Sequence, residues 1–317
     1  MMDQVMGRRR MRMIWYTFRS EPLTKTPKPS SAPVLSSTRF FVNDSTTLKQ
    51  SYSDHILERY EADVEQVDFS NKAEAVRRMN EYVEVASMGA FKDLTKEEAI
   101  SVDTTAILIN VIAFGGRWEL PFIARYNEEL PFNGSRGLRN MTFMMLNFDY
   151  LPVNIDNDFG TAILLKFEDP RYKFFMLMPK EHLDLETMRN DLTGEKLMDI
   201  LTNAKSTLLI VYPKVPKFEM ENDFDVTSIL SKLGVSTIFR DEADLSKMTE
   251  HTIKLGKIAQ LAAIKINEDG TAASAVTRSY FIQCSAPIAT PISITFDRPF
   301  LYGIMRDSDI LFLGQLV

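Results

Sequence analysis

Residues 104–114 read TTAILINVIAF, and this stretch decides the fold class. It is rich in β-branched residues and almost wholly apolar, a pattern typical of a strand that is buried on both faces in the middle of a sheet. The one polar residue inside the apolar run is Asn110. Buried amides need hydrogen-bond partners, so we expect Asn110 to bond to neighbouring backbone.

The segments around this strand show both helical and strand periodicity. The clearest amphipathic helix is predicted over 71–87, with Asn71 as its cap and Gly89 at its C-terminal end. Other helices are predicted over 46–60, 185–192, 195–203 and 226–233. Strands are predicted over 39–43, 63–69, 161–167, 174–178, 208–212, 258–266, 292–296, 300–305 and 311–316. Helices come mostly first and strands mostly last, an order that favours an α+β fold with large mixed sheets.

Composition limits the class of protein. The chain has 317 residues, of which 45% are hydrophobic and 25% charged, as in ordinary globular domains. Its apolar runs are too short to span a bilayer, so we expect no membrane partner. The single cysteine, Cys284, excludes an internal disulfide and any multi-cysteine metal centre. The net charge of −6 gives no general reason to expect nucleic acid as a partner.

The first 36 residues differ from the rest of the chain. They hold seven basic and two acidic residues, and residues 22–36 are rich in Pro, Ser and Thr. We predict that residues 1–36 are a disordered basic segment with a linker, and that residues 37–317 form one domain. A targeting or polyanion-binding arm is the functional alternative for the arginine-rich part.

Catalytic and metal-binding motifs are absent from the sequence. There is no HExxH, CxxC, GxGxxG, phosphate-loop or GxSxG pattern. The three histidines, at positions 55, 182 and 251, lie in charged or polar surroundings. The residues at 154, 156 and 158 imitate the start of a calcium loop, but the glycine is displaced and the twelfth position is Leu165. We therefore expect no metal, no cofactor and no enzyme activity.

The segment 264–277, IKINEDGTAASAVT, holds the most functional information. A strand runs into Glu268–Asp269–Gly270, and seven small or β-branched residues follow. These are Thr271, Ala272, Ala273, Ser274, Ala275, Val276 and Thr277. On composition alone, a surface loop rich in Ala and Ser explains the stretch.

The sequence resembles the serpin family over about residues 37–317. The motifs that carry the resemblance occur in the family's order and at nearly the family's spacing. They are Phe69–Ser70, Met79–Val83, Thr104–Phe114, Gly116–Glu119, Pro121–Phe122, Tyr212–Phe218, Leu233–Phe239, Ala243–Ser246, Asn267–Thr277, Asp297–Leu301 and Leu311–Gly314. The fold that this resemblance implies is a large mixed central sheet with further sheets, surrounding helices and an exposed reactive loop.

The resemblance implies a protease trap that needs no cofactor. In serpins a protease cleaves the reactive loop as a substrate, and the upstream half of the loop then inserts into the central sheet and carries the acyl-bound protease along. The hinge of that loop would be Glu268, Gly270 and residues 271–277, whose small side chains can enter a packed sheet and which include no Pro or charge. The region where the sheet opens would include Asn110, Trp118 and Gln260. Gln260 replaces the family's histidine, which weakens the expected hydrogen bond to Asn110 without abolishing it.

The reactive bond is predicted by counting from the hinge. Fifteen positions after Gly270, by the family's spacing, lies the Cys284–Ser285 bond, whereas counting back from Phe296 gives Pro287 or Ile288. No Lys or Arg lies between Arg278 and Arg298. This disfavours trypsin-like targets, so the expected partner is an elastase- or chymotrypsin-like serine protease, or a cysteine protease.

Two functions stay open at this stage. The first is a monomeric serine-protease inhibitor, and the alternative is a non-inhibitory serpin-like binding or carrier protein whose loop is cleaved as a simple substrate. The alternative gains weight because the family's first helices have no counterpart in this sequence. The family resemblance implies an extracellular location, with a cytoplasmic one as the alternative. Candidate glycosylation sites are Asn43, Asn133 and Asn140.

Overall fold

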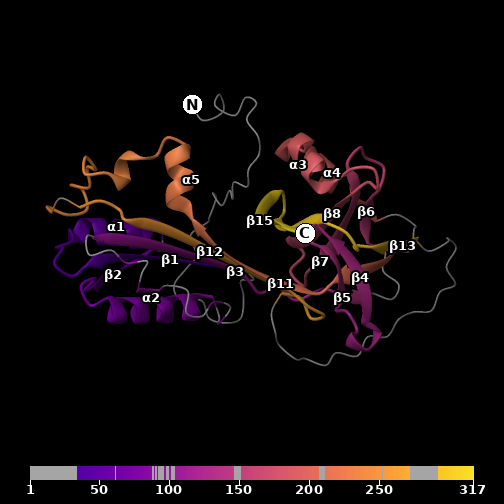
Figure 1. Cartoon of the computed structure of the whole chain (residues 1–317), viewed down its shortest axis with the longest axis horizontal. Helices are drawn as coiled ribbons and strands as arrows, with labels where there is room; N and C mark the ends of the chain where they lie inside the picture. The colour runs from indigo at the N-terminus through magenta and orange to yellow at the C-terminus, as the bar shows by residue number, and fades with distance from the viewer. Residues whose placement is uncertain are drawn as a thin grey trace. The chain divides into compact units, whose positions relative to one another are not determined.

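The computed structural model describes residues 34–60, 62–87, 89, 91, 96–97, 100, 104–145, 151–206, 211–251, 253–271 and 292–317. These residues form an α+β fold with three sheets, five α-helices and two short 3-10 helices (Figure 1). They divide into two compact units. The first unit contains the described residues up to Gly115 together with Glu219–Lys265, and the second contains Gly116–Phe218 and Ile266–Val317.

The first unit is built on a five-stranded mixed sheet in the order β11-β12-β3-β1-β2. The strand bounds are β1 Val34–Asn43, β2 Asp63–Val67, β3 Ala106–Phe114, β11 Phe218–Asp225 and β12 Lys257–Ile266. The strand predicted over 104–114 is β3, which lies in the middle of this sheet and is buried along most of its length. It pairs with β1 in the antiparallel direction and with β12 in the parallel direction.

Helices cover both faces of this sheet. The helix α2 (Lys72–Ala86) follows its predicted bounds closely, and the side chain of Asn71 accepts a hydrogen bond from the backbone N–H of Glu74 as a cap. The helix α1 (Gln50–Tyr60) begins four residues later than predicted, because Leu48 forms a β-bridge with Thr249 instead. The unit also contains α5 (Val226–Lys232) and the 3-10 helix η3 (Thr237–Phe239).

The hydrogen-bond partner predicted for Asn110 is wrong. The side-chain amide of Asn110 donates to the hydroxyl of Thr38 on the neighbouring strand β1 at 2.7 Å, not to backbone. Gln260 lies directly opposite Asn110 in the β12–β3 register. The strand order explains the difference, because β1 brings a side-chain hydroxyl next to the amide while the backbone groups are used by the ladder.

The second unit contains the other two sheets. Their orders are β13-β10-β5-β4 and β15-β14-β8-β7-β6-β9. The strand bounds are β4 Glu128–Gly134, β5 Gly137–Met145, β6 Pro152–Asn154, β7 Gly160–Lys166, β8 Tyr172–Pro179, β9 Lys205–Ser206, β10 Val211–Pro216, β13 Ile292–Thr295, β14 Phe300–Arg306 and β15 Asp309–Leu316. The helices are α3 (Leu185–Asp191), α4 (Gly194–Thr202) and the 3-10 helix η2 (Ala124–Tyr126), and α3 and α4 share an apolar cluster with β7, β8 and β14.

Several predicted boundaries differ from the structure. The strands β4, β5, β6, β9 and β11 were not expected, and β1 begins at Val34, three residues inside the segment predicted to be disordered. The predicted strand over 208–212 corresponds to β10, which begins at Val211, while residues 207–210 lie outside the described part of the chain. Among the residues that the structure describes, no helix is long and apolar enough to cross a membrane.

Burial of Tyr82 on α2 predicts a loss of stability at alkaline pH. Burial raises the pKa of Tyr82 to about 12, against the smaller opposing effects of its hydrogen bond to Ser37 and the charge of Arg39. An unfolded tyrosine titrates near 10, so between about pH 10 and 12 the unfolded chain releases a proton that the folded chain keeps. The free energy of unfolding should therefore fall as pH rises through this window.

Tyr82→Phe should reduce this alkaline loss, as measured by denaturant unfolding at about pH 8 and about pH 11. Tyr60→Phe is the control, because Tyr60 is 61% exposed. Tyr302, whose pKa burial also raises, stays in both variants. Equal alkaline losses in the two variants would contradict the prediction.

Candidate functional site

The candidate site is a tight turn that follows β12 directly. In this hinge turn (Asn267–Gly270), the backbone N–H of Asn267 donates to the carbonyl of Gly270 at 2.9 Å. The side-chain oxygen of Asn267 also accepts the N–H groups of Asp269 at 3.0 Å and Gly270 at 3.1 Å. Asparagine is suited to this position because its short side chain satisfies the backbone donors of the turn.

Gly270 is required by the geometry of the turn. Its φ of +138° lies in a region that side chains rarely adopt. A Cβ atom there would lie 2.1 Å from the carbonyl oxygen of Gly116 and 2.8 Å from the Cα of Arg117. Both are backbone atoms, so the neighbouring chain cannot make room by changing a rotamer.

Thr271, the next residue, is fixed to Gly116 by hydrogen bonds in both directions. Its backbone N–H donates to the Gly116 carbonyl at 2.7 Å, and its hydroxyl oxygen accepts the Gly116 N–H at 2.6 Å. The residue is only 6% exposed. A small polar residue therefore fits here, and a large or charged one does not.

The segment Gly116–Phe122 supports the rest of the hinge turn. The N–H of Trp118 donates to the carbonyl of Asp269 at 3.0 Å, and its indole N–H donates to the carbonyl of Asn267 at 2.8 Å. The indole ring stacks on Phe167, with the ring centroids 4.6 Å apart. The N–H of Phe122 bonds to the carbonyl of Glu268 at 2.9 Å.

The side chain of Glu268 anchors the hinge turn by charge. It accepts a hydrogen bond from the amide of Asn127 at 2.6 Å and one from the ammonium of Lys217 at 3.0 Å. Burial by itself would raise the pKa of Glu268, but the bonds from Asn127, from backbone and from Lys217 outweigh it and lower the pKa below its usual value. The carboxylate is thus held in its charged form.

Glu268→Gln should weaken the protein at neutral pH and have little effect in acid. A carboxyl group with a lowered folded pKa stabilises the native state above its unfolded pKa, and this contribution is lost as pH falls through the folded pKa. The variant should therefore lose about 1 kcal/mol near pH 7, and the difference should shrink towards pH 3. Denaturant unfolding of both proteins across this range measures it.

Glu119→Gln is the matched control for this experiment. Glu119 is 54% exposed and pairs with Lys166 at 3.9 Å, a long and solvated ion pair. A pH-independent loss in Glu268→Gln, or an equal loss in Glu119→Gln, would contradict the assignment.

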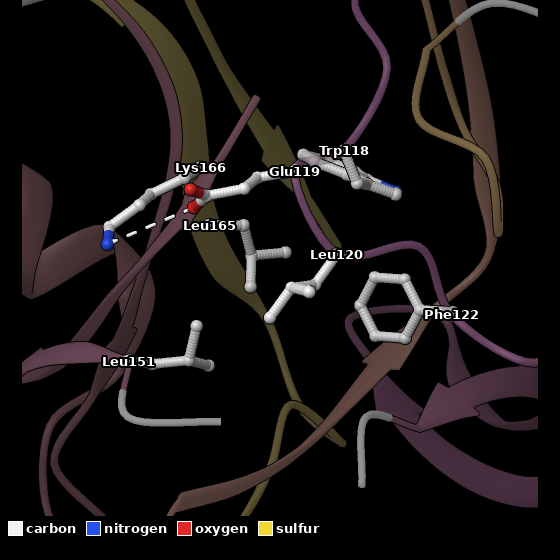
Figure 2. A pocket seen from close by; sticks show the side chains of 7 residues that line it. All are labelled: Trp118, Glu119, Leu120, Phe122, Leu151, Leu165 and Lys166. Atoms are coloured by element: carbon white, nitrogen blue, oxygen red, sulfur yellow. Dashed lines mark ion pairs between the residues drawn. The ribbon is translucent and has the colours of Figure 1, made fainter. Parts of the chain in front are cut away.

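A small cavity lies beside the segment Gly116–Phe122 (Figure 2). Its walls include Trp118, Leu120 and Phe122 together with Leu151 and Leu165, and the Glu119–Lys166 ion pair crosses one side. The volume of about 10 Å³ is near the minimum for a single water molecule. This cavity is therefore too small for an organic ligand.

The structure describes only part of the predicted site. Glu268, Gly270 and Thr271 lie together in the second unit with Trp118, whereas Asn110 and Gln260 belong to the first unit. The amide of Asn110 bonds to Thr38, and the expected bond to Gln260 is not formed among the described residues. The remaining predicted hinge residues and the predicted reactive bond lie outside the described part of the chain. They are Ala272, Ala273, Ser274, Ala275, Val276, Thr277, Cys284 and Ser285.

Two residues of the site were not predicted. Asn127 and Lys217 both donate hydrogen bonds to the carboxylate of Glu268. Lys217 lies in the family motif over 212–218, so the sequence offered a signal for it.

The glycosylation candidates remain predictions. Asn133 and Asn140 are exposed on the β4–β5 hairpin, and the side chain of Asn43 accepts a hydrogen bond from Ser45. Within the described ranges no group of three His, Cys, Asp or Glu side chains is placed to hold a metal.

The described residues form an α+β fold whose central sheet holds the parallel pair β3 and β12, with a hydrogen-bonded turn directly after β12. The chain matches the family "Serpin (serine protease inhibitor)" over residues 16–317, and it belongs to the serpin family. This match begins before residue 37, the predicted start of the domain. Members of this family are generally protease inhibitors and not enzymes.

Relatives and solved structures agree with this assignment. The chain is 30% identical to Serpin B4 of Homo sapiens over 273 residues, covering 84% of this chain and 69% of the relative. It is 28% identical to Alpha-1-antitrypsin 1-2 of Mus musculus, covering 87% of this chain and 66% of the relative. The structure of Serpin48 from the insect Tenebrio molitor matches with a TM-score of 0.77 and 25% identity, over 89% of this chain and 75% of that one.

One structural neighbour is a protein that binds a small molecule. Human thyroxine-binding globulin, solved in complex with thyroxine, matches with a TM-score of 0.78 over 89% of this chain and 74% of that one. At 24% identity the likeness concerns the fold alone.

Proposed function

We propose that this serpin inhibits serine-type endopeptidases by cleavage of its reactive loop, insertion of the loop and covalent trapping of the protease. The observation that carries the proposal is the parallel pairing of β3 with β12, followed by the hinge turn. Because β3 and β12 run in the same direction, a segment that reverses direction after β12 is antiparallel to both strands. Such a segment could lie between them and form ladder hydrogen bonds with β3 on one side and β12 on the other. Thr271, the first residue after the turn, is bonded to Gly116, two residues beyond the end of β3.

The chemistry would follow the first half of ordinary proteolysis. The serine hydroxyl of the protease attacks the carbonyl carbon of Cys284, the bond to Ser285 breaks, and the Ser285 amino group leaves with a proton. An ester then joins the protease to the loop. The bond near Pro287 or Ile288 is the alternative, and with a cysteine protease the link would be a thioester.

Loop insertion would trap that ester before water hydrolyses it. About ten new ladder hydrogen bonds at roughly 1 kcal/mol each supply on the order of 10 kcal/mol. The intact form is then protected kinetically and not thermodynamically. The target would be an elastase- or chymotrypsin-like enzyme, because residues 279–297 contain no Lys or Arg for a trypsin-like pocket.

A non-inhibitory carrier function is the second candidate, and one observation favours it. A cleft of about 280 Å³ in the second unit is lined by Leu164, Met198 and Leu201, with Lys173 and Asp307 among its polar residues. Its size is near the lower limit of small-molecule sites, and its lining combines apolar walls with charged groups.

A denaturing gel separates the two candidates. The purified chain is mixed with chymotrypsin-like, elastase-like and trypsin-like proteases, and the released C-terminal peptide is analysed by mass spectrometry. We expect a complex that survives denaturation with the first two proteases and a peptide that starts at Ser285. Complete cleavage without any complex would reject inhibition and favour the carrier function.

A further inference from the structure

The helix α5 carries an apolar stripe that the described part of the chain leaves partly uncovered. Its apolar residues, continued by the residue after the helix, recur at helical spacing and therefore share one face. They are Val226, Ile229, Leu230 and Leu233. None of the seven residues of α5, all of them described, is buried, and Leu233 is 58% exposed. Figure 1 shows α5 and α2 on opposite sides of the sheet of the first unit.

The C-terminal end of α5 adds Val235 to this stripe. Gly234, with a φ of +94°, ends the helix, and the N–H of Val235 donates to the carbonyl of Leu230 at 2.9 Å. This bond is typical of a helix end at which the residue after the glycine contacts the last helical turn. Val235 is 49% exposed, so the apolar surface continues past the helix. The α5 patch is defined by Val226, Ile229, Leu230, Leu233 and Val235.

The segment that carries the α5 patch is acidic. Residues 219–250 hold eight acidic and three basic residues, a balance of −5. Several exposed carboxylates of this segment form no ion pair with a described residue, and Asp225 among them caps α5 itself. These are Glu221, Asp225, Glu242 and Asp244. An exposed apolar surface within an acidic segment fits a partner that is both apolar and basic.

Residues 8–19, RRRMRMIWYTFR, have the complementary composition. This N-terminal arm holds five arginines and no acidic residue, a balance of +5. Four of its apolar residues recur at helical spacing and can share one face. They are Met11, Ile14, Trp15 and Phe18. Such a segment can bury an apolar face on another helix while its arginines bond to carboxylates.

The linker between the N-terminal arm and β1 is long enough to reach the α5 patch. Residues 20–33 include several prolines, and at about 3.1 Å per residue they span roughly 45 Å. Val34 pairs with Phe114 at one end of β3, whereas a hydroxyl of α5 accepts the N–H of Ile258, which pairs with Leu108. These points lie roughly 20 Å apart along the sheet and roughly 10 Å across it.

We propose that the N-terminal arm binds the α5 patch of its own chain. Its apolar face covers Leu233 and Val235, and its arginines lie against the carboxylates of residues 219–250. Attachment through the linker favours this partner over a free one, because a short tether gives an effective concentration in the millimolar range. The inference goes beyond protease trapping and does not depend on it, since neither surface includes the hinge turn.

Hydrogen–deuterium exchange of the full chain tests this binding. The amides of residues 8–19 should exchange at least about tenfold more slowly than those of a free peptide of the same sequence. Leu233→Gln should remove most of this protection, because it replaces an exposed apolar side chain of the α5 patch by a polar one. Raising NaCl from about 0.1 M to about 1 M should also accelerate exchange of residues 8–19 in the natural chain.

Leu138→Gln is the matched control. Leu138 is 71% exposed and lies on β5 in the second unit, so the same substitution is made away from α5. Equal exchange of residues 8–19 in the two variants would overturn the proposal, and so would exchange at the free-peptide rate in the natural chain. The amides of β3 and β12 report on folding and should not change. If Leu233→Gln disturbs them, Val235→Gln makes the same test outside the helix.

The concentration of the protein distinguishes binding within one chain from binding between two copies. Protection of residues 8–19 within one chain should be the same at about 1 μM and about 50 μM, because both partners belong to one molecule. Protection that increases with concentration would show that the N-terminal arm binds a second copy, and it would overturn the proposal.

Discussion

Thr271→Arg is expected to turn the protein from an inhibitor into a substrate that is cleaved and released. Thr271 is 6% exposed and is bonded to Gly116, at the start of the segment that follows β3. A guanidinium at this position would have to enter the sheet without a partner, and burying an unpaired charge costs several kcal/mol. Insertion should then be too slow to compete with hydrolysis of the acyl link.

The measurement is the fraction of protease that stays in a denaturation-resistant complex, together with the molar excess of serpin needed for full inhibition. We expect the complex to fall by at least about tenfold, since each 1.4 kcal/mol is a factor of ten. Thr271→Ser is the control, because it keeps the hydroxyl that accepts the Gly116 N–H. Undiminished complex in Thr271→Arg would refute insertion through this hinge, and a carrier would keep its ligand affinity in both variants.

Gly270→Ala should cause the second large effect, a loss of stability centred on the hinge turn. The added methyl group would meet the Gly116 carbonyl oxygen at 2.1 Å, and the φ of +138° is unfavourable for alanine. Relief of this clash would break the hydrogen bonds between Thr271 and Gly116. We expect a cost of about 2 kcal/mol or more.

The thermal midpoint at one fixed scan rate measures this cost, because a kinetically protected fold gives midpoints that depend on scan rate. Gly194→Ala is the control: nothing lies within 4 Å of the Cβ position there, and its φ is not positive. The control should change stability by less than about 0.5 kcal/mol. Equal midpoints for both variants would show that the hinge turn can move away from Gly116 at little cost.

The parts of the fold that sequence could predict are those with strong periodic signals. β3 is a long apolar run, and α2 has an apolar stripe and a side-chain cap, so both were predicted with nearly correct bounds. The β4–β5 hairpin was not expected. Along β4 only Phe132 is buried, so the strand shows no alternation. The turn itself is Ser135–Arg136, and the Asn133–Gly134 pair, a typical turn signal, lies at the end of β4 just before it.

The candidate site likewise contains some residues that the sequence could predict and others that it could not. Glu268, Gly270 and Thr271 were predicted because they follow one another after a strand and match a family motif. Asn127 lies 141 residues from Glu268 in sequence and Lys217 lies 51 residues away, so only the tertiary fold brings them together. The partner of Asn110 was wrong for a similar reason, since the strand that supplies Thr38 precedes it by 72 residues.

The position of Trp118 makes its fluorescence a probe of the hinge turn. The chain has two tryptophans, Trp15 and Trp118. Trp118 is 2% exposed, and its indole stacks on Phe167 and donates to the carbonyl of Asn267, the first residue of the hinge turn. In a Trp15→Phe background, the emission of one buried fluorophore would therefore follow any departure of the hinge turn in real time and without a label.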